Sequence, residues 1–130
     1  MEARELRVGN LIKVYPKPGE EVVLAVRELH RESIVGEFLR SPGFYMRASY
    51  KDLNPIPFDK SWLEKFNFYS EGKYWIINKG TSRFGIETEE EESAIRSILL
   101  SNNTHISGLE LNAVHQLQNI FYITTGQDLE

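Results

Sequence analysis

The chain has 130 residues, a length that suits one compact domain or two small subdomains sharing a core. It contains no cysteine, which excludes disulfides, thiolate metal sites and a cysteine nucleophile, and fits a reducing compartment. Its net charge of −4 lacks the basic balance of a general nucleic-acid binder. No apolar run approaches the roughly 18 residues that a membrane-spanning helix needs. We therefore expect a cytoplasmic protein.

The first 55 residues are predicted to form short strands separated by turns. Prolines and glycines mark the turns Pro16–Gly19 and Ser41–Gly43. The expected strands are Leu6–Val8, Leu11–Tyr15, Glu21–His30, Ile34–Leu39 and Phe44–Tyr50. Four or five strands with short turns in so few residues predict a small SH3-like β-barrel over residues 1–55. Such barrels bind peptides, nucleic acids or nothing, so this fold leaves the function open.

Residues 56–130 are predicted to form an α+β subdomain. Asn54–Pro57 reads as an extended connection, because a residue that precedes proline is pushed out of the helical region. The expected elements are a helix capped by Asp59 and ending at Phe66, the hairpin strands Lys73–Ile77 and Arg83–Ile86, an acidic loop Glu87–Glu92, the strands Ser93–Leu100 and His105–Ser107, and a last helix. The fold class is thus α+β: the SH3-like barrel, then a β-hairpin subdomain packed on a C-terminal α-helix, in one compact globular unit.

The last helix is predicted to begin near Glu110 to Asn112 and to end at Gly126, and it carries almost no charge. Residues 111–127 contain no Asp, Glu, Lys or Arg. One apolar stripe is made by Ala113, Val114, Leu117, Ile120, Phe121 and Thr124. A second, neutral polar stripe is made by His115, Gln118, Asn119 and Tyr122. Water-facing helix surfaces usually carry Lys and Glu, so this stripe predicts a covered face: core, subunit interface or ligand site.

Three segments resemble a family of small proteins encoded in Bacteroidota genomes, phages and mobile elements. Residues 114–119 read VHQLQN, followed by two aromatic residues and Thr125-Gly126, which resembles the family ending VHQLQNLYFALTGEEL. Residues 6–11 resemble its opening LRIGN pattern, and residues 55–66 resemble its central PIPLTEEWLLKFGF. Asn67 replaces a glycine, and Gln127-Asp128 replaces a Glu pair. The resemblance implies phage or mobile-element cargo and assigns no activity or site residue.

Histidine is the natural candidate for catalysis or metal binding, and the chain has His30, His105 and His115. None stands in an HxH or HExxH arrangement, so no metal site and no cofactor are predicted. There is also no GxSxG elbow and no P-loop. An enzyme would need a pocket that joins His115 to an acid such as Glu110 or Asp128. The patterns therefore favour a non-enzymatic binding protein.

Two hypotheses about binding follow. The first is a phage or mobile-element protein that uses the stripe His115, Gln118, Asn119 and Tyr122 to bind a host or phage protein or a nucleotide-type small molecule, with a homo-oligomer as a further possibility. One version is a counter-defence protein that sequesters a nucleotide signal or blocks a host protein. The alternative is a nucleic-acid-binding module in the barrel. Its expected residues are Arg40, Arg47, Lys51 and Tyr45, which combine cations with a stacking group.

Overall fold

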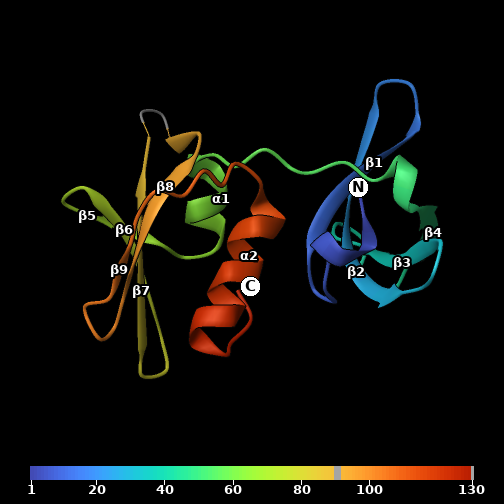
Figure 1. The fold of residues 1–130 in the computed structure, drawn as a ribbon. Helices are drawn as coiled ribbons and strands as arrows, with labels where there is room; N and C mark the ends of the chain where they lie inside the picture. The colour runs from blue at the N-terminus through green and yellow to red at the C-terminus, as the bar shows by residue number, and fades with distance from the viewer. Residues whose placement is uncertain (90–91, 130) are drawn as a thin grey trace. The chain divides into compact units, whose positions relative to one another are not determined.

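The computed structural model describes residues 1–89 and 92–129 and divides the chain into two compact units, Met1–Ile56 and Pro57–Glu130. Each unit has its own antiparallel sheet, and the second unit ends in a helix (Figure 1). The fold is therefore of the mixed α+β kind.

The first unit is a four-stranded meander that curls into a half-barrel (Figure 1). Its strands are β1 (Leu11–Lys17), β2 (Glu20–Leu29), β3 (Ser33–Phe38) and β4 (Tyr45–Ser49), and they pair in the order β1-β2-β3-β4. The concave side is lined by buried apolar side chains: Leu6, Ile12, Val14, Leu24, Val26, Ile34, Ala48 and Leu53. Alternation along the strands sends the other side chains to the convex outer face.

Gly36 allows the half-barrel to close around this core. It lies between Val26 on β2 and Met46 on β4, and a Cβ atom placed there would come within 2.9 Å of the Leu24 Cβ. Real Cβ atoms do not approach a neighbour so closely, so only glycine lets Leu24 lie against β3 in this way.

The predicted strand Leu6–Val8 was wrong. These residues follow a short 3-10 helix, η1 (Ala3–Glu5), and enter a turn. The Arg7 N–H donates to the Asn10 Oδ1 at 2.8 Å, and Gly9 has a φ of +98°. A side chain that bonds the backbone in this way offers the chain an alternative to a strand ladder, and alternation of apolar residues does not reveal it.

The second unit is built on a five-stranded sheet, which adds the strand Tyr69–Glu71 to the four strands expected from the sequence. Its elements are α1 (Lys60–Lys65), β5 (Tyr69–Glu71), β6 (Tyr74–Lys79), β7 (Ser82–Thr88), β8 (Ile95–Leu100), β9 (His105–Ile106) and α2 (Val114–Thr125). The strands pair in sequence order, and α2 runs along one face of the sheet (Figure 1). Phe84 of β7 packs edge-on against Phe121 of α2, with ring centroids 5.1 Å apart.

Both predicted helix signals are present. The Asp59 carboxylate accepts the Trp62 N–H at 3.2 Å and caps α1, and Gly126 takes the left-handed conformation that ends α2. However, α2 begins at Val114, later than predicted, because Leu111 bridges to Ile95 and so belongs to an extended segment. The predicted acidic loop falls partly on β7, which includes Glu87, while residues 90 and 91 lie outside the described ranges.

Candidate binding groove

A groove of about 460 Å³ lies in the first unit, where β1 and β4, the two outer strands of the sheet, flank the short 3-10 helix η2 (Tyr50–Asp52). Its lining residues come from β1, β4, η2 and the residue that follows Leu53: Val14, Tyr15, Pro16, Met46, Arg47, Ala48, Ser49, Lys51, Asp52 and Asn54. The groove is therefore made by segments more than 25 residues apart in the sequence.

The β4 wall of the groove is an open strand edge. Phe38 N–H donates to Phe44 O at 2.9 Å, and the register continues through the pairs Glu37–Tyr45 and Gly36–Met46. Because bonded and non-bonded pairs alternate in an antiparallel ladder, the main-chain groups of Tyr45, Arg47 and Ser49 point away from β3. Within residues 1–56, all of which are described, no backbone group bonds to them from that side. We call these three residues the open β4 edge.

The β1 wall is partly closed. Lys13 exchanges two backbone hydrogen bonds with Asn54, at 3.0 and 2.9 Å, so the outward groups of β1 are used at that point. Tyr15 is the next outward position along β1, and Pro16 follows with no N–H to offer. The pairing with β2 is irregular between Val14 and Lys17. The groove lies beside this irregular segment, beyond the Lys13–Asn54 bridge.

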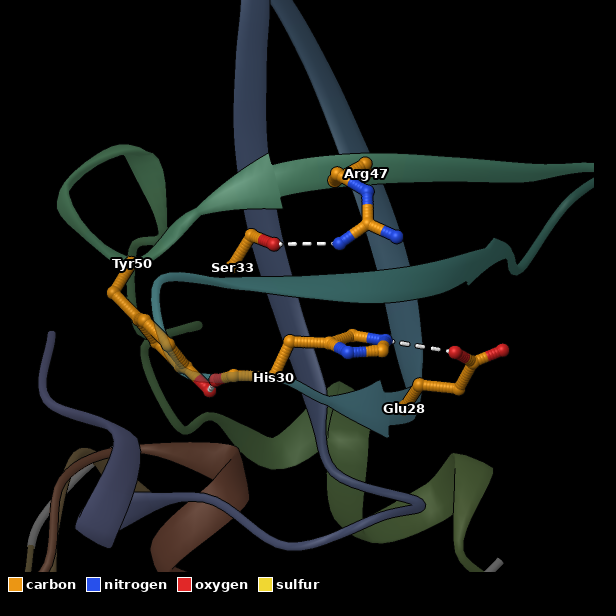
Figure 2. Close-up of polar contacts among 5 residues, drawn as sticks. All are labelled: Glu28, His30, Ser33, Arg47 and Tyr50. Atoms are coloured by element: carbon orange, nitrogen blue, oxygen red, sulfur yellow. Dashed lines mark hydrogen bonds and ion pairs between the residues drawn. The ribbon is translucent and has the colours of Figure 1, made fainter.

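Tyr50 holds η2 in place at the end of the groove. Its hydroxyl donates to the His30 carbonyl at 2.6 Å (Figure 2). Its own carbonyl accepts the Leu53 N–H and the amino terminus of Met1. The turn that joins β2 to β3 is closed in the same region by the His30 N–H, which donates to the Ser33 carbonyl. The positions of Lys51 and Asp52 are thereby tied to the rest of the sheet.

The charged residues at the groove are not neutralised by the unit itself. Arg47 donates from its guanidinium to the Ser33 hydroxyl at 2.8 Å, across the outer face of the sheet (Figure 2). Within residues 1–56, neither Arg47, Lys51 nor Asp52 forms an ion pair. By contrast, the His30 Nε2 on the same outer face lies 2.8 Å from the Glu28 Oε1 (Figure 2). Arg47 therefore keeps an uncompensated charge beside the open β4 edge.

Two residues of the first unit, Lys13 and Glu37, have pKa values shifted from their ordinary ones. Tyr15 and Glu21 raise the pKa of Lys13 above its usual range, since both stabilise the ammonium form. The Gly43 N–H and, after it, the Arg27 guanidinium lower the pKa of Glu37 by bonding its carboxylate. Glu37 accepts both bonds at 2.8 Å and so fixes the turn between β3 and β4.

The four residues predicted on the last helix do not share one environment. His115 and Gln118 are buried, with 3% and 4% of their surfaces exposed, and Asn119 is half-buried. Tyr122 is 42% exposed. The neutral stripe thus runs from the interior at the start of α2 to the surface near its end.

Of the four residues in the nucleic-acid hypothesis, two line the groove and two do not. Arg47 and Lys51 line the groove, and Tyr45, at the start of β4, is 56% exposed. Arg40 is exposed in the turn that joins β3 to β4 and does not line the groove. Sequence reasoning missed Tyr15, Asp52 and Asn54. Only Tyr15 carried a signal, as an aromatic residue at an outward position of a strand.

The described residues hold neither a metal-binding cluster nor a membrane-spanning helix. Among residues 1–89 and 92–129, no group of three His, Asp or Glu side chains could hold a metal ion. No helix in the same ranges is long and apolar enough to cross a membrane. The chain matches no protein-family model, no curated protein and no solved structure. The groove of the first unit remains the candidate site.

Proposed function

We propose that this chain is a non-enzymatic binding protein that takes a protein partner at the groove of its first unit. The observation that carries the proposal is the pairing of a concave groove with the open β4 edge, because unpaired strand edges are templates for other chains. The resemblance of the chain to phage and mobile-element proteins supports a host or phage protein as the partner. In this proposal the four-stranded meander and its Lys13–Asn54 bridge form a small barrel of the SH3-like kind.

Charge supports a protein rather than a nucleic acid as the partner. A groove that tracks a phosphate backbone needs several cations, whereas this one has Asp52 beside Lys51 and belongs to a chain of net charge −4.

Photo-crosslinking from inside the groove tests this proposal. A photoreactive phenylalanine derivative replaces Tyr15, which is 48% exposed and lines the groove, in cells that carry the natural gene. The matched control places the same group at Tyr69, 44% exposed in the second unit. We expect a discrete protein adduct from position 15 that is absent from position 69. Equal adducts from both positions, or none from position 15, would refute the proposal.

One observation favours nucleic acid as a second candidate. Tyr45 and Arg47 are two residues apart on β4, so their side chains lie next to one another on the outer face, where a base could stack beside a phosphate contact. A fluorescence titration with single-stranded DNA and RNA at two salt concentrations tests it. Affinity that falls steeply with salt and drops in Lys51→Ala would support nucleic-acid binding. The crosslink from position 15 would then be sensitive to nuclease.

A further inference from the structure

The two sheets differ in how their edges are protected. The outer strands of the second sheet, β5 and β9, have three and two residues, and very short edge strands are a common protection against unwanted pairing. In the first sheet, β1 is protected by Pro16 and by the bridge from Lys13 to Asn54. The five-residue strand β4 has neither feature. Among the described strands, it offers the most complete template for a further strand.

We propose that the open β4 edge accepts an extended segment of the partner protein as an added fifth strand of the first sheet. This inference rests on the proposed function and specifies how the partner binds. The outward N–H and C=O groups of Tyr45, Arg47 and Ser49 form the main-chain hydrogen bonds. Such bonds supply affinity in strand addition, while alternate side chains supply specificity.

The two faces of β4 define the side chains of the incoming segment. Met46 and Ala48 face the core, so the side chains beside them on the added strand are apolar. Arg47 is exposed and forms no ion pair within residues 1–56, so the side chain opposite it is acidic, because opposite charges on neighbouring strands attract. The partner segment is therefore an extended stretch in which apolar and acidic residues alternate.

Selection from a displayed library of random twelve-residue peptides on the full chain supplies the probe. We expect the enriched peptides to alternate acidic and apolar residues. Hydrogen exchange then gives the decisive pattern: a bound peptide slows exchange at the amides of Tyr45, Arg47 and Ser49 at least tenfold. The amides of Met46 and Ala48, which already bond to β3, change little. No enrichment, or protection that does not alternate along β4, would overturn the inference.

A proline substitution separates the main-chain contribution from the charge. Arg47→Pro removes an N–H that points away from β3, a position where an edge strand tolerates proline. Arg47→Gln removes the charge and keeps the N–H. We expect Arg47→Pro to weaken the selected peptide at least tenfold more than Arg47→Gln, with exchange at the β3 amides reporting that the sheet remains folded. Equal affinities in the two variants would contradict strand addition.

The outcomes also separate this inference from the proposed function. A protein crosslink from position 15 combined with a non-alternating exchange pattern would remove strand addition and leave a protein partner in the groove. Absence of a protein crosslink from position 15 would refute both the proposed function and strand addition. Enrichment of no peptide, together with salt-sensitive oligonucleotide binding, would assign the groove to nucleic acid.

Discussion

Two donors meet on one carboxylate at Glu37, beside the turn that starts β4. The Gly43 N–H bonds one oxygen and Arg27 bonds the other, both at 2.8 Å. These bonds favour the ionised form, so the pKa of Glu37 in the folded protein lies below its ordinary value of 4.5. A single side chain thus ties β2, β3 and the turn together on the outer face.

The sign of the pH dependence follows from this lowered pKa. The stabilising contribution of Glu37 is present above pH 4.5 and is lost as the pH falls through the lower pKa of the folded state. We expect Glu37→Gln to be less stable than the natural chain at pH 7, and the difference to shrink as the pH falls toward 3. Urea denaturation at several pH values measures it. The exposed Glu20→Gln variant serves as the control, and a constant difference for Glu37→Gln across this range would contradict the assignment.

At the scale of single elements, the packing of β6 against β7 depends on a glycine, Gly85, which has no side chain. Gly85 of β7 pairs with Ile76 of β6, and a Cβ atom on Gly85 would lie 2.7 Å from the Ile76 Cδ1. Ile76 is only 2% exposed, so its side chain has little room to move aside. The contact makes the two positions depend on each other.

A double-mutant cycle measures this dependence. We expect Gly85→Ala to lower the free energy of unfolding by about 1–3 kcal/mol, the usual cost of overpacking. Ile76→Val removes the Cδ1 atom, so Gly85→Ala should cost clearly less in the Ile76→Val background. Chemical denaturation of the four proteins gives the coupling energy. Strict additivity of the two substitutions would show that the close approach does not limit the packing.

Elements also show where sequence patterns were sufficient. Asp59 and Gly126 were predicted as helix boundaries because each signal depends on one residue and its immediate neighbours. β5 was missed because its residues Ser70 and Glu71 are polar and exposed, and only pairing with β6 makes them a strand. The start of α2 was placed too early because the bridge between Leu111 and Ile95 is a long-range contact.

In the candidate site, too, residues close together in the chain were predicted and those joined by long-range contacts were missed. Arg47 and Lys51 were noticed in the sequence because they are close together in the chain. Tyr15 was not joined to them, since the groove forms only when β1 and β4 come to lie on opposite sides of η2. The direction of the main-chain groups along β4 depends on the register with β3, which alternation of side chains does not specify.

At the scale of the whole molecule, apolar side chains pack together within each of the two units. The core of the first unit contains only residues between Leu6 and Leu53, with Met1 and Tyr50 packed against it. In the second unit, Phe84 is in contact with Phe68 and Phe121. Because each of these contacts lies within one unit, we expect damage to one core to leave the other folded.

Phe84→Ala tests that independence. Removal of a fully buried phenylalanine costs about 3–5 kcal/mol, and we expect the amides of β6, β7 and β8 to lose protection from hydrogen exchange. The amides of β2 and β3 should keep theirs, and a peptide selected on the groove should bind unchanged. Leu24→Ala in the first core is the matched control, with the opposite pattern expected. Loss of protection in both units from Phe84→Ala would show that they fold as one.

Gly36 also restricts how the groove can change over evolutionary time. Any larger residue there would press Leu24 away from β3, and its cross-strand partner Met46 both packs against the core and lines the groove. A mutation at this interior position would therefore alter the shape offered to a partner without changing a surface residue. Adaptation to a new partner is therefore easier by substitution of Tyr45, Lys51 and Asp52, whose side chains lie outside that core.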